Sequence, residues 1–360
     1  MYEYNHGGNA AFEAGKSNII DLSANINPLG ISQSITDAII KEVSNSNNYP
    51  DNFSTQLRQQ IGSFENVNPD WIFCGNGASD IIFRFPRVVQ AKKVLVTAPT
   101  FSDYQRSANA FGSEIVHYPL TAHYNFTVTN EIIEFIQREE PDLVFICNPN
   151  NPTGKLTEVS IIKEILNCCE KLCAKVIVDE CFLDFVKHSR EYTSKIFLEK
   201  YSNLIILKAF TKMFAIPGIR LGYALCTDRA LLKNLYFHGP DWSVSNLAQV
   251  AGVAALQSAK SFIKETEEYV SKERWRVENG LKQLGFKVFE SSANYVFFQS
   301  SYSFDLHVEL DKKGIRVRSC SNYQGLNDSY YRIAVSTKEN NTKVLTTIEE
   351  IILIKGIQQN

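Results

Sequence analysis

The sequence lacks an excess of charge of either sign and lacks any long apolar run. Its 360 residues include 37 Lys and Arg against 39 Asp and Glu, which gives a formal net charge of −2. It therefore has no overall positive field of the kind that binds a phosphate backbone. No apolar run approaches the roughly 20 residues needed to cross a bilayer, and the first residues do not resemble a secretion signal. We expect a cytoplasmic protein without a nucleic-acid or membrane partner.

Metal-binding and disulfide patterns are also missing. The 8 cysteines are spread along the chain apart from Cys168, Cys169 and Cys173, whose spacing lacks the paired C-x-x-C pattern of a zinc site. The 6 histidines are scattered, and none belongs to an H-E-x-x-H motif. A chain of this length can bury a large core without disulfides. The sequence therefore predicts reduced thiols and no metal site.

What the sequence does have is a regular alternation of strand and helix patterns between about residues 54 and 225. Short runs rich in β-branched residues are separated by amphipathic stretches, and most of these runs are apolar throughout, as strands covered on both faces are. The runs are Trp71–Cys74, Val94–Thr97, Glu114–His117, Leu143–Cys147, Lys175–Val178, Leu204–Leu207 and Leu221–Cys226. This alternation predicts an α/β fold in which helices flank a mainly parallel sheet.

The pattern changes after about residue 255. A long charged helical segment is followed by alternating strand patterns and a closing helix from Lys338. The strand patterns lie near Phe286–Glu290, Tyr295–Gln299, Arg316–Ser319 and Tyr331–Val335. The first thirty residues are too irregular to form a domain. We therefore expect an N-terminal arm (1–30), a large α/β domain (31–255) and a smaller α+β C-terminal domain (256–360).

Four motifs follow predicted strands, at the edge where open α/β sheets bind their ligands. The first, Gly75–Asp80, places two glycines and a serine before a helix, where free N–H groups can hold an anion. It lacks the third glycine of a dinucleotide-binding fingerprint, and the chain has no nucleotide P-loop motif. A glycine turn before a helix is structural more often than functional, so this motif alone decides nothing.

The other three motifs each have a plain structural explanation as well. Asp179 ends an apolar strand, where acids often cap helices. Asn151 lies in the turn Asn148–Gly154, which its prolines make rigid in any case. Lys212 follows another strand, with Arg220 eight residues later, and a lysine in a partly apolar crevice can become a nucleophile toward an aldehyde. Together, an anion cradle, a carboxylate, an amide and a lysine–arginine pair match the groups of pyridoxal phosphate.

With these motifs the chain resembles, over essentially its whole length, the fold type I pyridoxal-phosphate enzymes of the aminotransferase class I/II family. The resemblance implies a mainly parallel seven-stranded sheet in the large domain and pyridoxal 5'-phosphate as the cofactor. It implies that Lys212 binds the cofactor aldehyde and acts as a base, and that Asp179 pairs with the ring nitrogen. The other cofactor contacts that it implies are Gly77, Ala78, Ser79, Phe101, Asn151, Thr211 and Arg220.

Two branches of that family are similar to this sequence, threonine-phosphate decarboxylase of cobalamin biosynthesis and histidinol-phosphate aminotransferase. The run Leu22–Gly30 and the motif Arg318–Tyr323 favour the decarboxylase, and Phe182 stands where the aminotransferase has a tyrosine. We therefore expect a lyase that decarboxylates O-phospho-L-threonine to (R)-1-amino-2-propanol phosphate. The alternatives are an aminotransferase acting on histidinol phosphate or a similar phosphorylated amino compound, and a non-catalytic binding protein that keeps the fold. The resemblance implies substrate contacts from His6, Asn25, Asn151, Arg318 and Arg332.

The resemblance also implies an assembly. In this family, Tyr49 of the pair Tyr49-Pro50 would reach the cofactor phosphate of a neighbouring subunit. We therefore expect a homodimer with shared active sites, whose other partner is a small phosphorylated amino-acid substrate.

Overall fold

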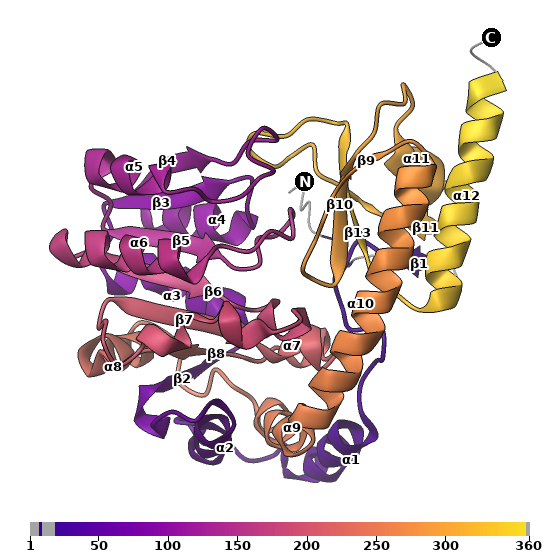
Figure 1. The fold of residues 1–360 in the computed structure, drawn as a ribbon. Helices are drawn as coiled ribbons and strands as arrows, with labels where there is room; N and C mark the ends of the chain where they lie inside the picture. Colours follow the sequence, from indigo (N-terminus) through magenta and orange to yellow (C-terminus); the bar gives the residue numbers. More distant parts are fainter. Residues whose placement is uncertain (1–6, 9–18, 358–360) are drawn as a thin grey trace.

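A seven-stranded, mainly parallel sheet forms the centre of the larger part of the chain (Figure 1). The computed structural model describes residues 7–8 and 19–357. Across the sheet the strands are β2 (Ile72–Gly75), β8 (Gly222–Leu225), β7 (Leu204–Ala209), β6 (Lys175–Asp179), β5 (Leu143–Cys147), β3 (Lys93–Ala98) and β4 (Glu114–Pro119). β8 is antiparallel to both of its neighbours, and the other pairs are parallel. Each predicted run overlaps one of these strands, so the predicted α/β fold with a mainly parallel sheet is confirmed.

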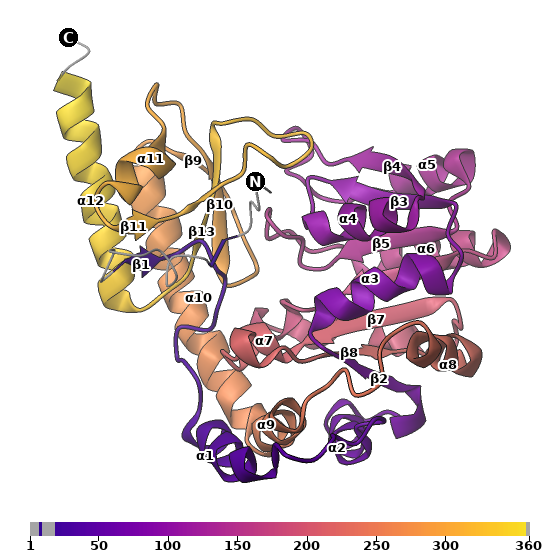
Figure 2. The same cartoon turned by 180° about the vertical axis from the view of Figure 1, so that it is seen from behind.

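Helices cover both faces of this sheet (Figures 1 and 2). α3 (Ala78–Val88) and α4 (Ser102–Phe111) lie on one face, with α8 (Arg229–Phe237) beside α3. α5 (Glu131–Glu139) and α6 (Val159–Lys171) lie on the other. β5 and β7 are buried at every residue, because a strand between two helical layers has no solvated side.

Three further helices lie near the β2 edge of the sheet and lead to the C-terminal part. They are α1 (Gln33–Glu42), α2 (Thr55–Glu65) and α9 (Asn246–Gln257). The long helix α10 (Ala259–Gln283) then runs to the second sheet. The short helical turns are η2 (Val43–Asn45), η3 (Pro69–Trp71), η4 (Leu183–Phe185), η5 (Ser189–Glu191), η6 (Ser194–Phe197), α7 (Phe210–Met213) and η7 (Pro217–Ile219).

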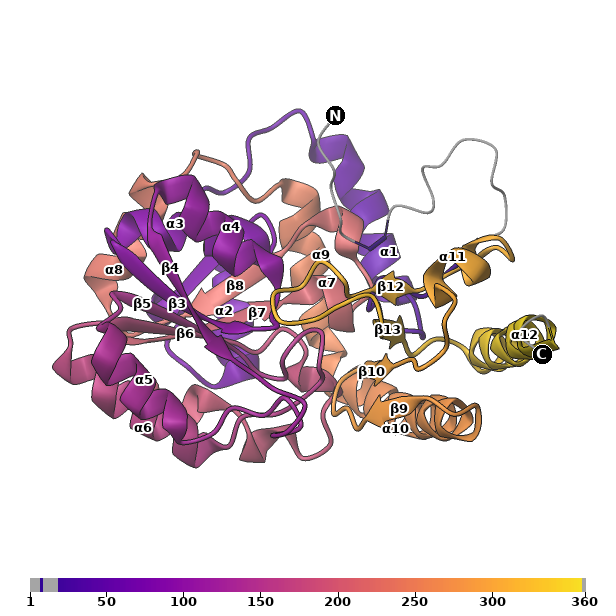
Figure 3. The same ribbon diagram turned by 90° about the horizontal axis from the view of Figure 1, so that it is seen from above.

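A four-stranded antiparallel sheet lies beside the large one (Figure 3). Its order is β12 (Arg318–Ser319), β13 (Tyr330–Ala334), β10 (Tyr295–Gln299) and β9 (Lys287–Phe289). α10, α11 (Leu306–Asp311) and α12 (Lys338–Ile357) lie along it. This arrangement is the α+β pattern that the sequence predicts, while the domain boundaries at residues 30 and 255 stay predictions.

One sequence-based expectation needs correction here. The run Arg316–Ser319 is not one strand, because it divides into β11 (Ile315–Arg316) and β12, which belong to different sheets. Within the predicted N-terminal arm, the sequence analysis also missed β1 (Ile20–Asp21), which pairs in parallel with β11. The chain from β1 onward is thereby attached to the C-terminal part.

The described residues contain no helix that is both long and apolar enough to cross a membrane. They also contain no cluster of three or more His, Cys, Asp or Glu side chains that could hold a metal ion. The cysteines are free thiols, and Cys173 is the exposed one.

A buried ion-pair network joins α2 to β7 and β8. The carboxylate of Glu65 accepts hydrogen bonds from Lys208 Nζ at 3.1 Å, Lys195 Nζ at 2.8 Å and the Tyr223 hydroxyl at 2.6 Å. Lys208 and Tyr223 stand directly opposite each other on antiparallel strands, so their side chains share one face of the sheet. Burial alone would raise the pKa of Glu65, but the charges of the two lysines outweigh it and lower that pKa to about 2.

We predict that Glu65→Gln destabilises the fold by about 3 kcal/mol, because it removes a buried counter-charge of Lys208. The folded-state pKa of Glu65 is depressed, so its contribution is present above the ordinary glutamate pKa and is lost as the pH falls toward about 2. Urea denaturation at pH 7 and at pH 3 measures both effects.

The matched control is Lys175→Met. It removes a more exposed ion pair on the same sheet, between Lys175 and Asp228 at 2.8 Å, and should cost less than about 1 kcal/mol. A Glu65→Gln protein as stable as this control would contradict the prediction.

Candidate active site

A cavity of about 330 Å³ lies where the carboxyl ends of β5, β6 and β7 face β12 and β13. The carboxyl ends of parallel strands meet at one edge of a sheet, so motifs far apart in the sequence converge there. Most of the predicted cofactor and substrate residues line this cavity. They are Asn25, Ala78, Ser79, Phe101, Asn151, Asp179, Thr211, Lys212, Arg220, Arg318 and Arg332.

The three remaining predicted residues do not line it. Gly77 lies just outside, in the turn before α3. The Tyr49 side chain is 79% exposed and stacks on Trp242 with ring centroids 4.3 Å apart. His6 lies outside the residues that the structure describes.

The N-terminus of α3 forms an anion cradle at one end of the cavity. Gly77 has a φ of +81°, which L side chains rarely adopt, so this turn favours glycine, and a Cβ atom there would lie 2.9 Å from the Arg220 guanidinium. Arg220 itself adopts a left-handed φ of 60°. The positive end of the helix dipole and a guanidinium therefore point to the same place, an arrangement that suits a phosphate.

The Ser79 hydroxyl is not directed into the cradle in the way that its motif suggests. Its hydroxyl donates to the buried Asp103 carboxylate at 2.9 Å, and Arg106 donates to the other oxygen of that carboxylate at 2.7 Å. The Ser79 hydroxyl is thus turned toward Asp103, whose place on the cavity wall the sequence analysis missed.

Lys212 lies in α7, directly after β7, with Nζ 5.9 Å from the centre of the Phe182 ring. Burial lowers the pKa of this lysine, and the nearby charges of Arg332 and Arg220 lower it further, to about 8. Neutral amine is then present at physiological pH, and neutral amine is the form that attacks an aldehyde.

Asp179 ends β6 and is buried. Its Oδ2 accepts a hydrogen bond from the Tyr104 hydroxyl at 2.6 Å, and its Oδ1 accepts one from the Cys181 backbone N–H at 2.9 Å. Burial raises the pKa of Asp179, and these hydrogen bonds and the Lys212 charge act in the opposite direction. Sequence analysis missed Tyr104, although it follows Phe101 by three residues at the start of α4, a spacing that puts both on one side of the helix.

Arg332 is a buried arginine with an unused donor. Its two terminal nitrogens donate to Asn151 Oδ1 and to the Ser23 carbonyl. Among the described residues, its Nε has no partner, and neither has the buried Oδ1 of Asn25 on the same cavity wall. Buried polar atoms are normally hydrogen-bonded, so these two atoms are suited to a polar ligand.

Arg318 stands directly opposite Arg332 on the antiparallel pair β12–β13. Opposite residues on such a pair project from the same face of the sheet, and like charges in that position destabilise it. Arg318 also donates to Asn322 Oδ1 at 2.8 Å and lies 5.4 Å from the Tyr323 ring centre. Both arginines line the cavity, and together they suit a ligand with more than one anionic group.

Comparison with known proteins agrees with this geometry. The family model for aminotransferase class I and II matches residues 17–348. The chain belongs to this family. Its members are fold type I pyridoxal-phosphate enzymes, so the predicted fold class and cofactor are confirmed, and the chain is an enzyme of this class.

Relatives of two activities match nearly the whole chain. Threonine-phosphate decarboxylase of Salmonella typhimurium is 32% identical over 359 residues, which cover 98% of each chain. Histidinol-phosphate aminotransferase of Methanococcus aeolicus is 30% identical over 341 residues, covering 93% of this chain and 90% of that one. The solved histidinol-phosphate aminotransferase from Clostridium acetobutylicum superimposes with a TM-score of 0.86 at 31% identity, covering 92% of this chain and 99% of its own.

We predict that pyridoxal phosphate attaches covalently to the cofactor-free enzyme faster as the pH rises through about 8, the pKa of Lys212. About a tenth of such a group is neutral at pH 7 and about nine tenths at pH 9, whereas an ordinary lysine is still almost fully charged. Stopped-flow measurement of the visible absorbance follows the attachment. Lys212→Ala should abolish both this absorbance and turnover, and attachment that persists in that variant would show that another residue holds the cofactor.

Proposed function

We propose that the protein is a threonine-phosphate decarboxylase, which converts O-phospho-L-threonine to (R)-1-amino-2-propanol phosphate. The observation that carries this proposal is the placement of Arg318 opposite Arg332 on the cavity wall. O-Phosphothreonine has a carboxylate and a phosphate, and a guanidinium group binds either one through paired hydrogen bonds. Histidinol phosphate has the phosphate without the carboxylate.

The residues of the cavity fit pyridoxal phosphate. The N-terminus of α3, Thr211 and Arg220 would hold its phosphate, Lys212 its aldehyde carbon and Asp179 its ring nitrogen. When bound, the cofactor supplies an aldehyde that captures the substrate amine and a ring that accepts the electrons of the bond that breaks.

The chain's own groups would then perform three tasks. Arg332 and Arg318 hold the two anionic groups of the substrate and so fix which bond at its reacting carbon is presented for cleavage. Lys212 Nζ returns a proton to the carbon that has lost CO₂. Phe182, which lines the cavity beside Lys212, offers an apolar surface and no hydroxyl, so Asn151 is left as a side-chain donor for the ring oxygen of the cofactor.

Transamination is the second candidate. Glutamate, a common amino-group donor, has two carboxylates and would also engage both arginines. The aminotransferase relatives are as similar to the chain as the decarboxylase relatives are.

A homodimer with shared active sites is part of the proposal. Tyr49 lies away from the cavity of its own chain, and its ring is exposed together with Trp242. An exposed pair of stacked aromatic rings is typical of an interface, and it leaves the Tyr49 hydroxyl available to a neighbouring subunit.

We predict that the purified enzyme with pyridoxal phosphate releases CO₂ from O-phospho-L-threonine without any keto acid. Arg318→Ala should raise the KM for this substrate by about 30-fold to several thousand-fold, because truncating one side of a buried charged pair costs about 2–5 kcal/mol. The cofactor absorbance should not change. Manometric or coupled CO₂ detection measures the reaction.

Arg138→Ala, on the exposed surface of α5, is the control and should leave KM unchanged. If histidinol phosphate reacts only with 2-oxoglutarate, and phosphothreonine releases no CO₂, the aminotransferase assignment replaces the decarboxylase assignment.

A mixing experiment tests the dimer. Tyr49→Phe and Lys212→Ala each damage the site, but if the two residues serve one site from different chains, a mixed dimer contains one site in which both are intact. We predict that activity recovers when the two inactive or weakened variants are mixed and allowed to exchange subunits. Verified exchange without recovery would refute a shared site.

A further inference from the structure

Tyr104 is a buried tyrosine on the cavity wall, and it is not among the residues proposed to hold the cofactor or the substrate. It lies in the first turn of α4, and its side chain is fully buried. Its hydroxyl donates to Asp179 Oδ2 at 2.6 Å. Burial, together with the negative charge of Asp179, holds the pKa of Tyr104 well above its ordinary value. The hydroxyl therefore stays protonated, and it remains a donor at every pH at which the enzyme works.

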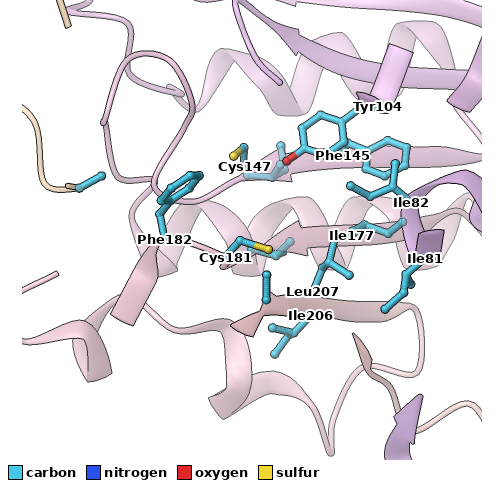
Figure 4. Packing of buried hydrophobic residues seen from close by; sticks show 14 of the residues in the cluster. Ile81, Ile82, Tyr104, Phe145, Cys147, Ile177, Cys181, Phe182, Ile206 and Leu207 are labelled. Carbon is cyan, nitrogen blue, oxygen red and sulfur yellow. The ribbon is translucent and has the colours of Figure 1, made fainter. Parts of the chain in front are cut away.

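The Tyr104 ring is fixed in place by two aromatic neighbours. It stacks on Phe145 of β5, with centroids 4.8 Å apart and planes at 13°, and meets Phe101 edge-on at 5.6 Å. Figure 4 shows its hydroxyl pointing toward Cys147, at the carboxyl end of β5. A tyrosine held in this way has little rotamer freedom left, so the direction of its O–H bond toward Asp179 is set by packing.

Asp179 needs such a donor because it is a carboxylate in a largely apolar position. Burial favours its neutral form, and a neutral carboxyl group would not hold a protonated ring nitrogen. Burial raises the pKa of the Cys147 and Cys181 thiols, so both stay neutral and add no negative charge beside Asp179. Support for the charged carboxylate therefore comes from the thiol and the backbone N–H of Cys181, the Tyr104 hydroxyl and the charge of Lys212.

We propose that Tyr104 is a positioning residue that keeps Asp179 ionised and aimed at the ring nitrogen of the cofactor. The inference rests on the proposed pairing of Asp179 with that nitrogen, and it holds whether the enzyme decarboxylates or transaminates its substrate. Phe101, which is predicted to stack on the cofactor ring, lies at the start of the same helix. The first turn of α4 would thus position the cofactor ring in two ways, by stacking on its face and by orienting the carboxylate that binds its nitrogen.

The test is Tyr104→Phe, which keeps the ring that packs on Phe145 and removes the hydroxyl alone. The readout is the ¹⁵N chemical shift of pyridoxal phosphate labelled at the ring nitrogen and bound to the enzyme, recorded against pH. A hydrogen bond to a charged group corresponds to about one to two pKa units. We expect the bound ring nitrogen to lose its proton at a pH lower by about one unit or more, and the Kd for the cofactor to rise about 10- to 100-fold.

Tyr201→Phe is the matched control. Tyr201 is equally buried, and its hydroxyl donates to Asn167 Oδ1 at the same distance of 2.6 Å, but it does not line the cavity. It should lose comparable thermal stability while its ¹⁵N titration stays that of the wild type. A merely structural Tyr104 would behave in the same way.

Asp179→Asn distinguishes a failure of the proposed Tyr104 role from a failure of the proposed pairing between Asp179 and the ring nitrogen. If this variant loses the protonated ring nitrogen and Tyr104→Phe titrates like the wild type, the role of Tyr104 is refuted and the proposed pairing stands. If Asp179→Asn also titrates like the wild type, the pairing itself fails and the role of Tyr104 fails with it. A shift in Tyr104→Phe that lies between the wild type and Asp179→Asn supports the proposal.

Discussion

The site depends on one electrostatic constraint, the crowding of positive charge around a single cavity at the carboxyl ends of the sheet strands. Lys212, Arg220, Arg318 and Arg332 line it, against the carboxylates of Asp103 and Asp179. Buried charges are costly unless they are paired. Burial together with this crowding lowers the pKa of Lys212, and the unpartnered Nε of Arg332 and the N-terminus of α3 add further donors around the cavity. Anionic groups of a cofactor and a substrate would neutralise this excess of positive charge, so the cavity suits a substrate with two anionic groups.

Successive side chains of β7 point to opposite faces of the sheet, so the cavity and the buried ion-pair network around Glu65 lie on opposite sides of this strand. Ala209 lines the cavity, so the adjacent Lys208 projects from the other face, where it meets Glu65 and Tyr223. The segment between β7 and β8 carries Thr211, Lys212 and Arg220. The ion-pair network lies on the opposite face of these two strands, next to the point where they lead into this segment. The network can therefore hold these two strands, and with them the reacting side chains, without placing another polar group in the cavity.

Much of the fold could be predicted from the sequence, because apolar runs such as Leu143–Cys147 indicate strands that are buried on both faces. Ligands bind at the carboxyl ends of parallel strands, so Asp179, Asn151 and Lys212 could be assigned to one site without knowledge of any contact. The remainder depends on pairings across the molecule. The division of Arg316–Ser319 between two sheets follows from where β1 lies. The hydrogen bond from Tyr104 to Asp179 and the convergence on Glu65 join helices to strands at positions where no local spacing marks the partner.

The pairing of β1 with β11 has a consequence for how the enzyme is made. Ile20 pairs with Ile315, the Leu22 carbonyl accepts from Ala334 N–H, and the Ser23 carbonyl accepts from Arg332. The cavity wall that carries Asn25 therefore gains its support only after almost the entire chain has left the ribosome. At about 5–20 residues per second, the seven strands of the large sheet can be complete several seconds before that moment. A nascent chain can thus hold a finished large sheet while the cavity still lacks the wall that carries Arg318 and Arg332, because both residues belong to the last strands to be made.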